Sequence, residues 1–197
     1  MALTTSCQAN PARPRHTYRD YAALPEGAPY QLVEGELLMT PSPVALHQRL
    51  SGSLFVQLCD WVKGSAAGEV FIAPFDVIFD DENVLQPDLL FVSRERSSIV
   101  QDFCRGAPDL VVEVLSPSTA SLDRSRKLRT YSRFGVARVW LIDPAEQTFE
   151  CLLLDGATYR IEVTFAGEEV AEPPGFPGLR ISLAQVWPAP SAPAGGR

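Results

Sequence analysis

The chain has 197 residues, of which 46% are hydrophobic and 21% are charged. This composition is typical of a globular protein, and the length suffices for one sizeable domain with its own core. No apolar run approaches the ~20 residues that a membrane-spanning helix needs. The N-terminus also lacks the basic and apolar segments of a signal peptide. We therefore expect a cytoplasmic protein that does not bind membranes.

The cysteines are far apart and form no CxxC pair, so the sequence indicates neither a zinc site nor a disulfide framework. They are Cys7, Cys59, Cys104 and Cys151. The formal net charge of −7 argues against non-specific binding of nucleic acid. Basic residues nevertheless gather in one stretch, which fits either a phosphate-bearing substrate or a solvated helix face. They are Arg124, Arg126, Lys127, Arg129, Arg133 and Arg138.

In chain order, a capped start at Thr17 predicts a short helix over residues 17–24. A hairpin is expected over residues 30–39, with its turn at Glu34-Gly35. Leucines at every fourth position then predict a long helix that opens at Ser42-Pro43 and ends at Gly64. The lone histidine of that helix, His47, is expected to be a boundary residue without a catalytic role.

The rest of the chain is expected to be mainly strands, of which 69–79 is bent at Pro74 and 84–92 pairs back on it. The last two strands form a hairpin around Asp155-Gly156. Helices are predicted over residues 118–134, with Ser118 or Thr119 as cap, and 182–187, and a loop over 168–178. The other strands are predicted over residues 110–115, 139–142, 148–154 and 158–165.

This order of elements predicts an α/β fold, with a strand–helix–strand unit over residues 110–142 inside a more antiparallel meander. We expect a single domain over residues 16–187. Residues 1–15 and 188–197 are rich in proline and polar or small residues, and are predicted to be disordered tails.

Two apolar strands each contain a carboxylate, and these residues are the first candidates for a functional site. Glu113 interrupts the run Leu110–Leu115, and Asp88 follows Pro87 at the start of another apolar run. A buried carboxylate is costly unless it is paired, hydrogen-bonded or bound to metal. Two acids in neighbouring strands can bind a hard divalent cation, which prefers oxygen ligands. Each acid could instead be structural, with Asp88 facing solvent and Glu113 paired with an arginine of the next helix.

Pro87-Asp88, Glu113-Val114-Leu115 and a following helix with Asp123 and Lys127 resemble the PD-(D/E)xK nuclease superfamily. More closely, the chain resembles the Uma family of restriction-endonuclease-like proteins over residues 17–187. That resemblance implies a mixed sheet core flanked by helices, with additional β-hairpins. The segments that support it are Tyr30–Glu36, Ser116–Thr119, Phe134–Val136, Val139–Pro144 and Pro177–Arg180.

The resemblance implies a Mg²⁺- or Mn²⁺-dependent nuclease in which Asp88, Glu113 and the carbonyl of Val114 bind the metal. Glu34 is the residue that fits an additional upstream acid. The superfamily lysine belongs two residues after the second acid, where this chain has Leu115. The family resemblance points to Lys127 of the next helix as its replacement. Lys127 could also form only a surface pair with Asp123, four residues earlier on the helix.

The expected partner is nucleic acid, DNA more than RNA, and the expected assembly is a homodimer. The alternative is a catalytically inactive module of the same fold that binds nucleic acid or protein. In that case the acids are merely ion-paired, and the displaced lysine and the negative net charge favour this interpretation. Dependence of activity on a divalent metal and on Glu113 separates the two hypotheses.

Overall fold

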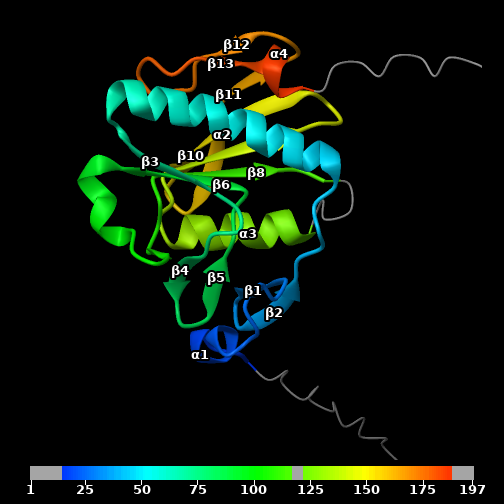
Figure 1. The fold of residues 1–197 in the computed structure, drawn as a ribbon, viewed down its shortest axis with the longest axis vertical. Coiled ribbons are helices and arrows are strands. Elements are labelled where there is room, and N and C mark those ends of the chain that lie inside the picture. Colours follow the sequence, from blue (N-terminus) through cyan, green and yellow to red (C-terminus); the bar gives the residue numbers. More distant parts are fainter. Residues whose placement is uncertain (1–14, 117–121, 188–197) are drawn as a thin grey trace, which may run out of the picture.

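The computed structural model describes residues 15–116 and 122–187, without the side chains of 122–124 (Figure 1). The predicted tails, except Arg15, and the predicted helix caps Ser118 and Thr119 lie outside these residues. Arg15 forms an ion pair with Glu82. None of the described helices is both long enough and apolar enough to cross a membrane.

A mixed six-stranded sheet is the centre of the α/β fold. Its strands, in spatial order, are β11 (Thr158–Ala166), β10 (Thr148–Asp155), β9 (Arg138–Asp143), β8 (Leu110–Val114), β6 (Leu89–Ser93) and β3 (Gly68–Ile72). Strands β8 and β9 are parallel, and the other neighbours are antiparallel. The parallel pair is joined by the predicted strand–helix–strand crossover, whose helix ends before Gly135 in the left-handed conformation (φ 77°).

A second sheet lies below the first and carries the N-terminal hairpin (Figure 1). Its strands, in order, are β2 (Glu36–Met39), β1 (Tyr30–Val33), β5 (Asn83–Leu85), β4 (Val77–Asp80) and β7 (Cys104–Arg105). A short ribbon pairs β12 (Val170–Ala171) with β13 (Ile181–Ser182). The helices are α1 (Tyr18–Ala22), α2 (Ala45–Ser65), the 3₁₀ helix η1 (Arg94–Ile99), α3 (Leu122–Arg133) and α4 (Leu183–Val186).

Helices α2 and α3 cover opposite faces of the six-stranded sheet (Figure 1). Leu50, Leu54 and Leu58 of α2 pack into one core cluster with every second residue of β8, including Val112. On the other face, Tyr131 of α3 packs with Val111, the residue of opposite orientation in the strand, and with side chains of β9. The run from Leu110 to Val114 is therefore apolar on both faces, as a strand covered on both sides requires.

The two longest predicted strands were each wrong in continuity, because each divides between the two sheets. Residues 69–79 form β3 in one sheet and β4 in the other, and residues 84–92 form β5 and β6. The partners still pair as predicted, β3 with β6 and β4 with β5. Pro74 and Pro87 lie at the divisions, where the missing backbone N–H interrupts a ladder. Apolar residues occur on both sides of each proline, so the sequence pattern did not indicate that the strand divides there.

The long helix starts and ends later than its sequence signals. It begins at Ala45, after the extended Val44, because the segment after β2 first climbs from the lower sheet to the level of α2 (Figure 1). It passes Gly64 and ends where Ala66 adopts the left-handed conformation (φ 53°). Leu46 is consequently part-exposed, and the buried leucine stripe starts at Leu50. The predicted loop over residues 168–178 contains β12, a second small correction.

Candidate active site

The two candidate acids lie at one end of two inner strands of the six-stranded sheet, where β8 ends and β6 begins. Leu89 of β6 pairs with Val112 of β8 in antiparallel register. Continuing that register by one residue sets Asp88 opposite Glu113. Opposed residues of an antiparallel pair point to the same face of the sheet, with Cβ atoms about 5 Å apart. The local strand pairing thus brings together two carboxylates that are 25 positions apart in the sequence.

Asp88 is held by groups from two elements. Its Oδ2 accepts a hydrogen bond of 2.7 Å from the backbone N–H of Val114, where β8 ends. The same oxygen lies 3.2 Å from Nε2 of His47, in the first turn of α2. The hydrogen bond with Asp88 raises the pKa of His47, and the charge of Glu113 adds to that effect. The contact with Asp88 therefore stabilises the protonated imidazole.

The carboxylate of Glu113 is bound by two side chains that lie one turn apart on α3. Nζ of Lys127 lies 2.9 Å from Oε2 and 3.2 Å from Oε1. The hydroxyl of Tyr131 donates to Oε1 at 2.5 Å. Burial raises the pKa of Glu113, Lys127 opposes that rise, and the negative charge of Asp88 reinforces it. Burial and the adjacent Glu113 carboxylate also raise the pKa of Tyr131, so this hydroxyl remains a donor.

These four charged side chains form a recessed cluster. The side chains of His47, Asp88, Glu113 and Lys127 are between 13% and 17% exposed. They come from four elements: α2, the start of β6, β8 and α3. We name this cluster, together with the fully buried Tyr131, the acid–lysine site. Like charges repel strongly in such a poorly solvated place, so Asp88 and Glu113 need positive charge beside them, part of which Lys127 supplies.

Comparison with known proteins gives this arrangement a family. A family model described as "Putative restriction endonuclease", Uma2, matches residues 17–184. The chain belongs to the Uma2 family. A solved structure described as a "putative nuclease" from Anabaena variabilis ATCC 29413 has the same fold, with a TM-score of 0.72 at 22% sequence identity. The match covers 87% of this chain and 97% of that one. No curated protein matches the chain.

The donor groups in the acid–lysine site decide whether it can hold the predicted metal ion. Asp88 and Glu113 offer oxygen atoms, and their mutual repulsion is what a divalent cation relieves. Within residues 15–116 and 122–187, however, no group of three His, Cys, Asp or Glu side chains is arranged to hold an ion. The two acids thus fit a cation that takes its other ligands from a backbone carbonyl, such as that of Val114, and from water or a phosphate.

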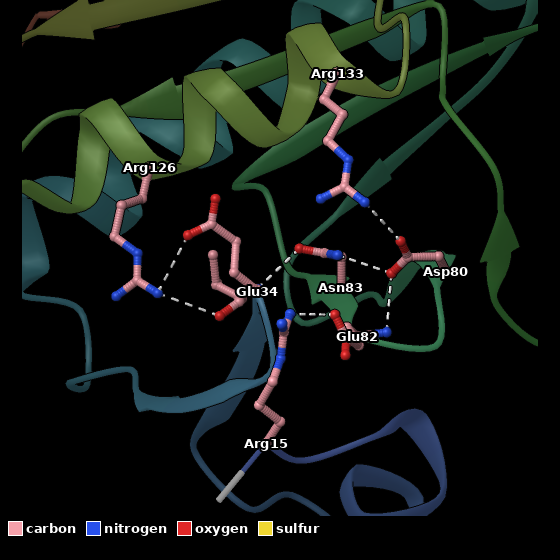
Figure 2. A network of polar contacts seen from close by, with 8 residues as sticks. Arg15, Glu34, Asp80, Glu82, Asn83, Arg126 and Arg133 are labelled. Carbon is pink, nitrogen blue, oxygen red and sulfur yellow. Dashed lines mark hydrogen bonds and ion pairs between the residues drawn. The ribbon is translucent and has the colours of Figure 1, made fainter. Parts of the chain in front are cut away.

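Glu34, the proposed upstream acid, is engaged elsewhere (Figure 2). Its carboxylate lies 3.7 Å from Nη2 of Arg126, whose Nη1 donates to Glu36 at 2.9 Å. Its backbone N–H donates to the Asn83 side chain at 2.9 Å, which fixes the turn between β1 and β2. Glu34 is also 43% exposed, unlike the recessed acids. Its role as a ligand stays a prediction, and its contacts in the structure are those of a hairpin anchor.

The basic stretch of α3 and β9 is largely neutralised by ion pairs. Arg126 is bound to the hairpin and Lys127 to Glu113, while Arg133 lies 3.5 Å from Asp80 (Figure 2). Arg138 pairs with Glu162 across the sheet. The stretch therefore ties the two sheets to α3 more than it presents free positive charge. The predicted alternative pair of Lys127 with Asp123 involves a side chain outside the described residues.

Sequence reasoning missed His47 and gave Tyr131 no role beyond sharing a helix face with Lys127. The four-residue spacing of Lys127 and Tyr131 was a usable signal, because residues so spaced on a helix can both reach one buried acid. His47 offered a weaker signal: a polar residue beside a leucine stripe, in the first turn of a long helix. Nothing in the sequence states that this turn lies against Asp88, 41 positions later.

Proposed function

We propose that this chain is a divalent-metal-dependent nuclease that hydrolyses phosphodiester bonds, with DNA as its substrate. The observation that supports this most is the assembly of Asp88, Glu113 and Lys127 at one edge of the sheet. These are the residue types of the superfamily motif, and the lysine reaches Glu113 although it belongs to another element. Membership of the Uma2 family supports the same class of reaction.

In this proposal Asp88, Glu113 and the carbonyl of Val114 hold one Mg²⁺ or Mn²⁺ ion. When bound, the ion acidifies a coordinated water and neutralises charge on the phosphate. The hydrogen bond from Val114 and the contact with His47 hold the carboxylate of Asp88 beside the end of β8. Tyr131 keeps Glu113 in one rotamer by donating to a single oxygen, Oε1.

Lys127 supplies the positive charge in the proposed reaction. Its ammonium is compact and carries three donors, so it can keep Glu113 as a partner and still meet a phosphate oxygen. Charge that develops on the phosphorus oxygens in the transition state is stabilised by such a fixed cation in a poorly solvated site. The recessed position of Lys127 strengthens that interaction, because solvent screens it little.

A second candidate is a binding module of the same fold without catalytic activity. The observation in its favour is that Asp88, Glu113 and Glu34 each have a cationic or hydrogen-bonding partner within the protein. A cluster that is complete in this way has no need of a metal. We rank it second because Glu113 is recessed and is held by both Lys127 and Tyr131. Such a fixed position suits an acid that acts on a ligand more than one that only forms an ion pair.

We further propose that the protein acts in the cytoplasm as a homodimer, because cutting both strands of a duplex takes two such sites. Sedimentation equilibrium at two protein concentrations measures the mass directly. A dimer mass, about twice 21.6 kDa, is expected. A mass that stays at one chain over both concentrations would contradict the dimer but not the nuclease chemistry.

The test is a calorimetric titration of Mn²⁺ into the wild type, Glu113→Gln and Glu146→Gln. The second variant is a control, since Glu146 is an exposed acid in the β9–β10 turn. The same proteins are then incubated with single- and double-stranded DNA, with Mg²⁺ or with a chelator. We expect Glu113→Gln alone to lose both binding and cleavage while it remains folded by circular dichroism, with a lower melting temperature because Lys127 loses its charged partner. Full metal-dependent cleavage by Glu113→Gln would refute the proposed site, and DNA binding without cleavage would favour the binding module.

A further inference from the structure

His47 uses only one of its two ring nitrogens in the contacts of the acid–lysine site. Nε2 faces Asp88, whereas Nδ1 is buried without a hydrogen-bond partner in the part of the chain that the structure describes. One helical turn further along α2, Ser51 is only 4% exposed, and its Oγ is also buried without a partner there. Two unsatisfied polar atoms thus occur on residues four apart in one helix.

The spacing suggests that the two atoms serve one another. Residues four apart lie on the same face of a helix, with Cβ atoms about 6 Å apart. A buried polar atom without a partner is destabilising, and native proteins commonly satisfy such an atom with an ordered water. The third atom in this state, Nε1 of Trp140, differs because its ring packs among apolar and aromatic side chains.

A hydroxyl is the right group for this position. It can accept a hydrogen bond from a protonated Nδ1 and can donate one to an unprotonated Nδ1, and a water between the two groups can do the same. Ser51 therefore suits His47 in either protonation state. An alanine at position 51 would leave the buried Nδ1 without this partner, and the contact of Nε2 with Asp88 alone would then set the ring orientation.

We propose that Ser51 is a positioning residue: through one buried water it holds Nδ1 of His47 and so directs the Nε2–H at Asp88. This inference rests on the proposed function for its consequence, the orientation of a metal-binding aspartate. Its structural content, the coupling of Ser51 to the His47 ring, does not depend on that function. A series of contacts would then run from Ser51 through the water and His47 to Asp88 and the end of β8.

The first arm of the test is ¹⁵N NMR of the imidazole rings at alkaline pH, where the rings are neutral. The chain has two histidines, so His16→Gln assigns the His47 signals by elimination. In the wild type we expect the proton on Nε2 and an Nδ1 resonance that is shifted by the hydrogen bond this nitrogen accepts. In Ser51→Ala the Nδ1 resonance should move to the position of an imidazole nitrogen without a hydrogen bond, because the group that holds the water is gone.

Ser53→Ala is the matched control, because Ser53 lies on the same helix and donates instead to the carbonyl of Gln185 at 2.8 Å. It should leave the Nδ1 resonance of His47 unchanged. An unchanged Nδ1 resonance in Ser51→Ala overturns the inference, whether or not the protein proves to be a nuclease. Both variants remove only a hydroxyl, so we expect them to fold, and circular dichroism checks this directly.

The second arm measures cleavage. Loss of an outer partner of a metal-binding group commonly costs about tenfold or more, so kcat should fall by that amount in Ser51→Ala at an unchanged KM. Ser51→Thr restores the hydroxyl and should recover the Nδ1 resonance and most of kcat. A shifted Nδ1 resonance without any cleavage by the wild type would support the role of Ser51 and refute the proposed function. A shifted Nδ1 resonance with unaltered kcat would overturn its positioning role.

Discussion

Nζ of Lys127 lies 2.9 Å from Oε2 of Glu113, although the lysine belongs to α3 and the acid to β8. In the superfamily pattern the lysine follows on the same strand as the acid, where this chain has the part-buried Leu115. The parallel crossover from β8 to β9 allows the exchange, because it packs α3 directly over the strand it has just left. An ammonium group one element away thus reaches the place that the strand position would have supplied.

The first prediction concerns that ammonium. Lys127→Met keeps the length and the apolar stem of the side chain but removes its charge. We expect kcat to fall about a hundredfold or more, which is the usual effect of losing one group that stabilises transition-state charge. Mn²⁺ binding, measured by calorimetry, should persist because Asp88 and Glu113 remain.

Arg129→Met is the control for this variant, since Arg129 is exposed on the same helix. Its cleavage rate should match the wild type at moderate salt. If Lys127→Met cut DNA at the wild-type rate, the lysine would be only the structural partner of Glu113.

A second prediction compares Tyr131, which is buried, with Tyr159, which is part-buried against the same core cluster. Tyr131→Phe removes the hydroxyl that donates to Glu113, and Tyr159→Phe removes one that donates to the carbonyl of Val136 at 2.7 Å. Each change should lower the free energy of unfolding by about 1–3 kcal/mol, because each removes a hydrogen bond to a buried acceptor. Chemical denaturation measures both losses.

Only Tyr131→Phe should also weaken Mn²⁺ binding and cleavage, since only this hydroxyl holds an acid of the site. Equal losses of activity in the two variants would show that stability alone is responsible. A loss in neither would show that Glu113 keeps its position through Lys127.

Much of this site could be predicted from the sequence because its parts are local. Glu113 stands out as a charge in an apolar strand, and Lys127 lies on the helix that immediately follows. The predicted crossover then brings strand and helix together, as the structure has it. Asp88 needed one further step, the pairing of its strand with β8, and the apolar run after Pro87 was enough to suggest it.

The remainder depends on long-range geometry that no local pattern encodes. His47 meets Asp88 because α2 starts two residues later than its proline signal, which depends on the path between the sheets. Glu34 and Glu36 are equivalent in sequence, two acids around one glycine, and Arg126 binds both. The division of two predicted strands between the sheets likewise arises from packing. The sequence does not indicate it, since apolar residues occur on both sides of Pro74 and Pro87.

A third prediction tests Glu34 as a metal ligand. Glu34→Gln should leave the Mn²⁺ dissociation constant within about twofold of the wild type, because the carboxylate lies beside Arg126 and is part-exposed. Loss of that ion pair should change the stability of the protein by at most about 1 kcal/mol. Glu36→Gln, which changes the other partner of Arg126, is the matched comparison. Calorimetry would assign Glu34 to the metal if Glu34→Gln weakened binding as strongly as Glu113→Gln while Glu36→Gln did not.

The last prediction concerns the thiols. Burial raises the pKa of Cys104 to about 11 and that of Cys151 to about 12. The thiolate is the reactive form, so near pH 8 only about one in a thousand Cys104 side chains is ionised, and fewer at Cys151. We expect iodoacetamide to leave both unmodified in the native protein and to modify both in guanidinium chloride. Peptide mass spectrometry measures the two states, and part-buried Cys59 is the internal reference. Modification of native Cys104 as fast as Cys59 would mean that the lower sheet opens readily at β7, which contains Cys104.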